Sequence, residues 1–358
     1  MVSDKAQRYE VKQRVAEGRT VVVARALDRE SGREVTLKTL RDDHATYPER
    51  VAAFSTSSKL AASLLHASLV PVIAARRVGA RIYTVSPWVS GIKLTDLPLP
   101  LDVPTAASVV SQIAEGMAVA HATGIILRGI NPRDFLIRSD GQVLLIDLNK
   151  VQMPGMSGPL PPAPSRAEVI RYLPMEARSG GLIDGQTDIF ALGAMTLELL
   201  TGVPPTPEGA VDMKPAVIST LTAQGPAGQL AKIAMTLAAP RADQRPQSVA
   251  NLTSQLETFW TSAGFASSKA GVLSTAQKFF PATPARTTTG VTPAQAARPT
   301  APGAPASAAG TSSTTPRPAP PPRAPSAPGA PAATRPVSGP VAGAGAGARP
   351  ISSPPRPA

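Results

Sequence analysis

The chain changes character near Pro281, and this change limits how much of it can fold around a core. Its last 78 residues hold 20 of the 40 prolines in the 358-residue sequence and contain no Asp, Glu or Lys. Such a segment cannot bury enough apolar surface to offset the entropy lost on ordering. We therefore predict a disordered tail over residues 281–358 and a folded domain only before it.

The tail also carries most of the net charge. Of the total of +12, the tail supplies +7 and the rest of the chain +5. Residues 318–323 match the PxxPxR pattern that suits SH3 grooves, so a tail-binding partner is one alternative. No aromatic side chain follows Phe280 to stack on bases, and we expect no specific nucleic-acid partner. The tail's charges are all arginines: Arg286, Arg298, Arg317, Arg323, Arg335, Arg349 and Arg356.

The absence of cysteine excludes several classes of protein. A disulfide framework, thiol catalysis and Cys-ligated zinc all require it. Residues 1–11 are polar and do not resemble a secretory signal. The most apolar run, residues 60–75, is broken by polar residues and falls short of the ~20 residues that a spanning helix needs. We expect a cytoplasmic location and no membrane segment.

The pattern of the first 260 residues indicates an α+β fold, with strands early and helices later. β-branched runs flank a turn at residues 28–32, and longer apolar-periodic segments follow after Gly91. This order predicts a small β-rich part followed by a larger helical part. Strands are expected within residues 9–40, 70–73, 81–85 and 135–146, and helices at 51–65, 106–123, 187–200, 230–237 and 248–260.

Six motifs in this order resemble the bacterial Ser/Thr protein kinase family, and the resemblance covers roughly residues 9–260. It implies a bilobal fold with an N-lobe over residues 8–89, a C-lobe over 90–262 and a transitional segment over 263–280. The motifs are VTLK at 35–38, IILRGINPRDFLI at 125–137, LLIDLN at 144–149, YLPME at 172–176, TDIFALG at 187–193 and RADQRP at 241–246.

The catalytic loop that the resemblance implies is degenerate. A kinase has an aspartate where this chain has Gly129, which has no side chain to take the substrate hydroxyl's proton. The histidine before it is replaced by Leu127, and the loop lysine by Asn131, so only Arg128 of the family's triplet remains. General-base catalysis is typically worth ~10²–10⁴-fold, so the loss of the base alone would be severe.

The residues that would bind nucleotide are partly lost. Lys38 matches the lysine that holds the phosphates, but its expected glutamate partner is Ser57, and no Asp or Glu occurs between Glu49 and Asp96. Of the three glycines in the family's phosphate loop, only Gly18 remains. The alternative is that Gly18 is simply the turn residue of a hairpin. Trp88 lies in the expected hinge, where it either borders a nucleotide or packs within the lobe.

Two carboxylates remain where the family binds metal. Asp147 occupies the position of the metal-binding aspartate, and Asp134 that of the metal-binding asparagine. Carboxylates serve Mg²⁺ well, and without a cation two of them in one cleft would repel and raise the pKa of one. The alternative is that Asp147 caps a turn and Asp134 bonds nearby backbone amides.

The positions that resemble the family best are architectural. Asp188 matches the aspartate that holds the catalytic-loop backbone, and it is also a candidate N-cap for a helix starting at residue 189. Glu176 and Arg245 match the glutamate–arginine pair of the large lobe, which would cost ~3–5 kcal/mol to break from one side if buried.

These residues predict a pseudokinase, a signalling scaffold or allosteric regulator without the catalytic aspartate, whose nucleotide binding is weak or absent. It would require no cofactor, with ATP and Mg²⁺ as candidates. Expected partners are other signalling proteins, such as a kinase, phosphatase or receptor. One alternative is a divergent Ser/Thr kinase or nucleotidyl transferase that uses Asp134 and Asp147 with Mg·ATP. The other is an adaptor acting through the proline-rich tail.

Overall fold

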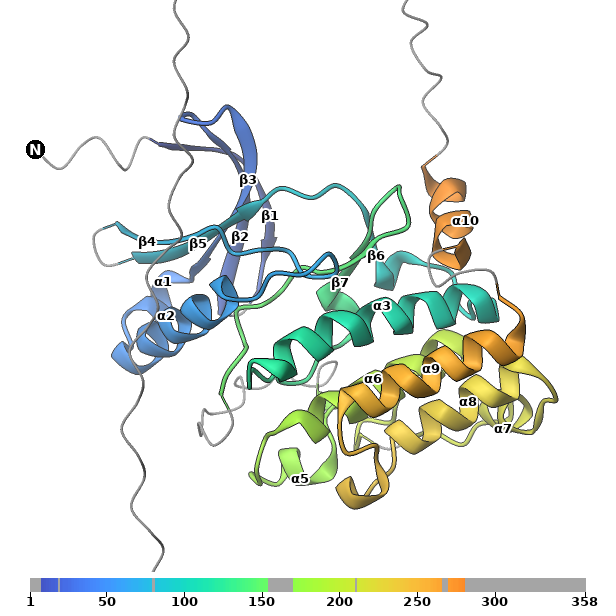
Figure 1. Cartoon of the computed structure of the whole chain (residues 1–358). Coiled ribbons are helices and arrows are strands. Elements are labelled where there is room, and N and C mark those ends of the chain that lie inside the picture. Colours follow the sequence, from blue (N-terminus) through green and yellow to red (C-terminus); the bar gives the residue numbers. More distant parts are fainter. Residues whose placement is uncertain are drawn as a thin grey trace, which may run out of the picture. The chain divides into compact units, whose positions relative to one another are not determined.

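The computed structural model describes residues 8–18, 20–78, 81–153, 170–209, 211–265 and 270–280. These residues form two parts, an antiparallel sheet with two helices and a larger helical part (Figure 1). The predicted α+β bilobal arrangement is therefore confirmed. The predicted tail, residues 281–358, lies outside the described residues.

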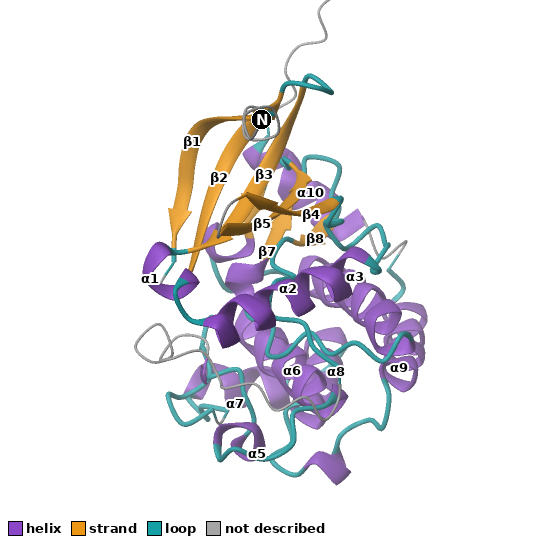
Figure 2. Ribbon diagram, turned by 90° about the vertical axis from the view of Figure 1, so that its left-hand side faces the viewer, coloured by secondary structure: helices purple, strands orange, loops and turns teal. Residues whose placement is uncertain are grey.

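The N-terminal part is a five-stranded sheet in the order β1-β2-β3-β5-β4 (Figure 2). The β-branched runs supply β2 and β3, which pair antiparallel from Val21 with Leu40 to Asp28 with Arg33. Lys38 lies opposite Val23 in this register, and Thr84 of β5 pairs with it from the other side. The elements are β1 (Tyr9–Glu17), β2 (Val21–Asp28), β3 (Arg33–Leu40), α1 (Asp42–Ala45), α2 (Pro48–Ala62), β4 (Ala74–Val78) and β5 (Arg81–Pro87).

The C-terminal part is built from helices around a second, three-stranded sheet in the order β6-β7-β8. The helices α3, α6, α8 and α9 enclose the main core, which includes the fully buried Met117, Ile189, Leu192 and Leu199. The elements are β6 (Ile92–Lys93), η1 (Leu94–Asp96), α3 (Val103–Ala122), η2 (Pro132–Asp134), β7 (Phe135–Ile137), β8 (Val143–Leu145), α5 (Met175–Arg178), α6 (Gly185–Thr201), α7 (Pro215–Thr222), α8 (Pro226–Leu237), η3 (Ala242–Gln244), α9 (Val249–Ala263) and α10 (Ala270–Phe279).

Side-chain caps fix where the long helices begin. The carboxylate of Asp102 accepts from the backbone N–H of Thr105 at 2.8 Å and starts α3. Asp184 caps α6 in the same way, and Ser248 caps α9. At the other end of α6, Gly202 takes φ 71°, a left-handed conformation that glycine adopts without a Cβ penalty. These caps satisfy backbone donors and acceptors that a helix end otherwise leaves without partners.

One predicted strand is wrong. Residues 70–73 are not a strand, and β4 starts after them at Ala74. Instead, the backbone N–H of Val70 donates to the carbonyl of Leu145, and Leu69 forms a β-bridge to the same residue. The segment thus bonds to β8 of the C-terminal part. Pro71 has no N–H to continue a ladder at this point.

Helix α10 was not predicted from the sequence, where residues 263–280 are expected to be a transitional segment. It packs against the start of α3 (Figure 1). The buried hydroxyl of Thr105 bonds to the carbonyl of Gly271 and to the hydroxyl of Thr275, both at 3.1 Å. Val272 and Ala276 belong to the main core. This helix is therefore part of the C-terminal core.

No helix within the described residues is both long and apolar enough to span a bilayer.

Gly271 tests how closely α10 must approach α3. Alanine normally favours a helix over glycine by up to ~1 kcal/mol. A Cβ at Gly271, however, would lie 2.3 Å from the carbonyl oxygen of Pro104. We therefore expect Gly271→Ala to lower the free energy of unfolding by about 1–3 kcal/mol, as overpacking does. Gln277→Ala, at an exposed position of the same helix, is the control and should not lower it. Stabilisation by Gly271→Ala in chemical denaturation would contradict this packing.

Candidate functional site

The loop around Gly129 has a left-handed backbone at two successive residues. Gly129 has φ 74°, and Arg128 before it has φ 65°, both left-handed. A Cβ on Gly129 would lie 2.4 Å from Cδ2 of Leu173. Gly129 is buried between this leucine and the loop's own anchor. A side chain at the position that the family uses for its base would therefore have to displace the end of the Leu173 side chain and hold a left-handed backbone.

The anchor of this loop is the carboxylate of Asp188, which is fully buried on α6. It accepts from the backbone N–H of Leu127 at 2.7 Å and from that of Gly129 at 3.1 Å. The third partner is the Nε2 atom of His121, at 2.9 Å. The N-cap of α6 is Asp184, so Asp188 does not cap this helix.

Asn131 and Asp134 form a closed capping box at η2. The Asn131 backbone N–H and its Nδ2 donate to Oδ2 of Asp134 at 2.9 and 2.7 Å, and its Oδ1 accepts from the backbone N–H of Arg133. Both Asn131 and Asp134 are buried. Asp134 thus bonds nearby amides, the alternative considered above for this residue. The Asn131 side chain therefore makes these hydrogen bonds within the loop.

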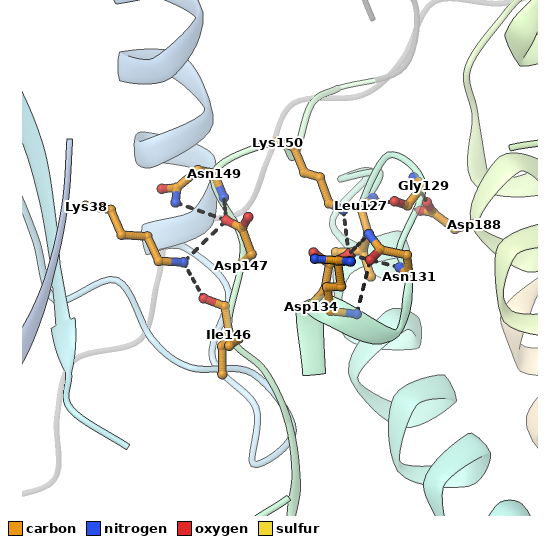
Figure 3. Close-up of polar contacts among 11 residues, drawn as sticks. Lys38, Leu127, Gly129, Asn131, Asp134, Ile146, Asp147, Asn149, Lys150 and Asp188 are labelled. Atoms are coloured by element: carbon orange, nitrogen blue, oxygen red, sulfur yellow. Dashed lines mark hydrogen bonds and ion pairs between the residues drawn. The ribbon is translucent and has the colours of Figure 1, made fainter. Parts of the chain in front are cut away.

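Lys150 joins this group from a different segment. Its Nζ donates to Oδ2 of Asp134 at 2.5 Å and to the carbonyl of Gly129 at 2.9 Å (Figure 3). The Lys150 side chain is 22% exposed and that of Asp134 is 8% exposed. A cation therefore lies beside the catalytic loop although the family's loop lysine is replaced by Asn131.

Lys38 reaches from β3 to the second carboxylate. Its Nζ donates to the carbonyl of Ile146 at 2.5 Å and lies 3.3 Å from Oδ1 of Asp147. The same oxygen accepts from the backbone N–H and the Nδ2 of Asn149 at 3.2 and 3.0 Å. Helix α2 offers no carboxylate after Glu49, and Ser57 stands at the position of the family's glutamate. Lys38 therefore pairs with the segment around Asp147.

The two carboxylates differ in their readiness to ionise. Burial opposes the charge on Asp147, but the ammonium groups of Lys38 and Lys150 outweigh it and hold its pKa at about 2. Burial raises the pKa of Asp134, with Lys150 opposing that rise and the charge of Asp147 adding to it. The ion pairs thus decide the state of Asp147, and desolvation dominates at Asp134. Burial also lowers the pKa of the Arg128 guanidinium.

These residues do not fit a divalent cation. Mg²⁺ takes near-octahedral oxygen ligands at about 2.1 Å. Oδ2 of Asp134 already receives three donors, two from Asn131 and one from Lys150. Within the described ranges, no cluster of three or more His, Cys, Asp or Glu side chains is placed to hold a metal ion.

At the expected hinge, Trp88 stacks with an arginine of the five-stranded sheet. The Arg25 guanidinium lies 4.9 Å from the centre of the Trp88 ring and bonds both oxygens of Glu34 at 2.9 and 2.6 Å. Arg25 pairs with Thr36, which is two residues from Lys38, so Arg25 and Lys38 share a sheet face. Trp88 thus packs within the lobe.

At the opposite end of the same sheet, Gly18 forms the hairpin between β1 and β2. Its backbone N–H donates to the carbonyl of Val21 at 2.9 Å. The amide is therefore used within the turn. A cavity of about 730 Å³ lies on the face opposite Lys38, lined by Tyr9, Leu37 and Tyr83 among others.

Glu176 and Arg245 lie together in the C-terminal part. Nη1 of Arg245 is 2.7 Å from Oε1 of Glu176, and the guanidinium also donates to the carbonyls of Ala239, Pro240 and Gln186. It lies 5.0 Å from the centre of the Phe190 ring. The Arg245 side chain is fully buried and that of Glu176 is 36% exposed, so this is a half-buried pair.

Sequence reasoning missed Lys150 and His121. Neither stands at a motif position, and their carboxylate partners lie 16 and 67 residues away along the chain. The only signal in the sequence was indirect. The carboxylates of Asp134 and Asp188 need donors, and the family's lysine and histidine beside them are replaced by Asn131 and Leu127.

Comparisons with known proteins concern the folded domain as a whole. The protein kinase domain family model matches residues 9–259. The chain is 27% identical over 201 residues to Serine/threonine-protein kinase PknL of Mycobacterium tuberculosis, covering 55% of this chain and 50% of PknL. It is 30% identical over 210 residues to Serine/threonine-protein kinase PrkC of Bacillus subtilis, covering 58% of this chain and 32% of PrkC. The chain thus spans half or less of the length of these relatives.

The fold is also similar to a solved structure, the kinase domain of Mycobacterium tuberculosis PknI. The TM-score is 0.55 at 21% identity, and the match covers 71% of this chain and 96% of that chain. A likeness at this identity concerns the fold alone.

Asp188 and Asp184 form a matched pair of aspartates on one helix. Asp188→Asn places an N–H₂ group against a buried donor, so we expect a loss of at least about 2 kcal/mol in the free energy of unfolding. Asp184→Asn keeps a good N-cap and should cost no more than a few tenths of a kcal/mol. Urea denaturation measures both variants, and equal losses would show that the loop does not depend on Asp188.

The low pKa of Asp147 predicts a pH dependence. Its folded value of about 2 lies below the ordinary 3.8, so the ionised carboxylate contributes stability that is complete above about pH 5 and is lost as the pH falls toward 2. We expect the wild type to exceed Asp147→Asn in Tm by a constant margin above pH 5, and the margin to shrink between pH 5 and pH 3. The charge of Asp147 raises the pKa of Asp134, so both proteins are compared with Asp134→Asn in the background, which removes that contribution. A margin that grows as the pH falls would contradict the ion pairing with Lys38 and Lys150.

Proposed function

This chain belongs to the protein kinase domain family, and we propose that it is a pseudokinase, a signalling scaffold or allosteric regulator that transfers no phosphate. The observation that carries the proposal is Gly129. It stands where the family resemblance places the general base, and a side chain there would need the tip of Leu173 to move and a backbone conformation that L residues rarely adopt.

The cleft supports the same proposal. The family's reaction uses ATP and Mg²⁺, with a lysine that a glutamate orients toward the phosphates. Here Lys38 is engaged by Ile146 and Asp147. Near the hinge, Arg25 and Trp88 stack on the sheet face that a nucleotide base would use. Nucleotide binding is accordingly weak or absent in this proposal.

The architectural contacts favour a role in binding. Asp188 holds the loop and Arg245 is fully satisfied by Glu176 and backbone carbonyls, so the domain keeps a defined shape without a nucleotide. A stable shape is what a scaffold presents to its partners. We propose that these are other signalling proteins, such as a kinase, phosphatase or receptor.

A divergent transferase that uses Asp134 and Asp147 is the less favoured function. Asp134 is buried and bonded to Asn131, and each aspartate already has a lysine partner. The other alternative is an adaptor acting through the tail, and the tail lies outside the described residues.

Phosphate transfer is the direct test. Purified full-length chain incubated with γ-labelled ATP and Mg²⁺ or Mn²⁺ should label neither itself nor generic protein acceptors above background. Gly129→Asp should not gain transfer, because the new side chain would meet Leu173 and a left-handed backbone that costs about 1–2 kcal/mol. Gly129→Ala is its structural control and should lose a similar amount of stability.

The opposite result is equally clear. Label incorporation by the wild type that disappears in Asp147→Ala would establish an active transferase. Comparison of α- and γ-labelled ATP would then separate nucleotidyl from phosphoryl transfer.

A further inference from the structure

Two lysines and two aspartates form two ion pairs beside the loop that carries Gly129. Lys38 comes from β3 and pairs with Asp147, whereas Lys150 lies three residues after Asp147 and pairs with Asp134 (Figure 3). The two lysines balance the two aspartates, so the group is neutral as it stands.

Lys150 acts on both carboxylates. It touches Asp134 at 2.5 Å, and its charge also lowers the pKa of Asp147. Its bond to the carbonyl of Gly129 adds an oxygen from the loop backbone. A carboxylate and a carbonyl oxygen in direct contact, with the charge of Asp147 acting from farther away, are the surroundings of a cation with a preference for oxygen.

We propose that the ammonium group of Lys150 takes the place of a divalent metal ion as the counter-ion of Asp134 and Asp147, so that this cleft neither needs nor binds Mg²⁺ or Mn²⁺. The chain carries its own cation, fixed to the backbone three residues from one of the carboxylates that it serves.

The physical reason is competition within one molecule. A metal ion that bound Asp134 would have to displace an ammonium group that is tethered close to it, and a tethered group has a high effective concentration. Lys150 also adds a third donor to the two that Oδ2 of Asp134 receives from Asn131, which leaves little room for metal ligation while Lys150 is present. The cost of burying Asp134 as a charge is offset by Lys150 in the absence of metal.

Removal of Lys150 should expose the opposite behaviour. In Lys150→Met, Asp134 loses its cation and Asp147 loses one of two, so the two carboxylates repel and become open to an external cation. The proposal therefore predicts a measurable result: Lys150→Met, which loses a positive charge, should gain a metal site.

The inference deepens the proposed function and rests on it only in expecting no reaction that would need the metal. Its test measures metal binding in the absence of nucleotide. Failure of the metal test leaves the transfer result untouched, and transfer by the wild type would leave the metal result to be read separately.

The experiment is a Mn²⁺ titration of the full-length chain, followed by thermal unfolding and by the electron paramagnetic resonance signal of free Mn²⁺. The wild type and Lys150→Arg should show no change in Tm and no loss of free Mn²⁺. Lys150→Met should start at a lower Tm and then rise by roughly 5–10 °C at a Mn²⁺ concentration about a hundred times its Kd. Lys150→Met combined with Asp134→Asn should lose that rise.

Two results would overturn the proposal. One is saturable Mn²⁺ binding by the wild type that Asp134→Asn removes, which needs no Lys150 variant to fold. The other is a folded Lys150→Met, verified by circular dichroism, that Mn²⁺ does not stabilise.

Discussion

The buried carboxylate of Asp188 sets the geometry on which the rest of the candidate site depends. A fully buried charge is costly unless donors surround it, and Asp188 receives them from Leu127, Gly129 and His121. These bonds fix the loop in a path with left-handed residues at 128 and 129. That path brings the carbonyl of Gly129 to Lys150 and closes the space beside Leu173. The position of the tethered cation therefore follows from one anchored backbone, whereas the missing base follows from the identity of Gly129.

The parts of the fold that the sequence predicted are those with strong local signals or several ordered motifs. The strands within residues 9–40 and the long apolar helices have a clear period, and six motifs in series specified how they assemble. Helix α10 was not predicted because the residues that approach α3 most closely, Gly271 and Thr275, are poor indicators of a helix, although Val272 and Ala276 also lie in the core. Residues 70–73 are mostly apolar and β-branched, but Val70 bonds Leu145 of β8 and Ile73 bonds Val85 of β5, a division that no local pattern reveals.

At the candidate site, the missing family residues could be identified from the sequence, but the residues that replace them as partners of the aspartates could not. Gly129, Asn131 and Ser57 can be identified one position at a time, because a motif states what should stand there. Lys150 and His121 become relevant only after folding brings them to Asp134 and Asp188. Buried charges require partners whatever the function of the protein, so a charge lost at one position creates a demand that any nearby segment can meet. Sequence reasoning that stops at the missing residue therefore overestimates the damage to the local electrostatics.

This distinction bears on what a degenerate cleft retains. Catalysis needs groups placed to a fraction of an ångström around a reacting phosphate, whereas neutralisation needs only an opposite charge within bonding reach. Lys38 and Lys150 meet the second requirement and leave the first unmet, since both are bound to aspartates and loop carbonyls. The bond from Lys38 to Ile146 and that from Thr84 to Asn149 also connect the five-stranded sheet to the segment after β8. The bonds from Lys38 and Thr84 thus join the two parts within the chain itself, and in the proposed function they keep the binding platform defined without a bound nucleotide or metal.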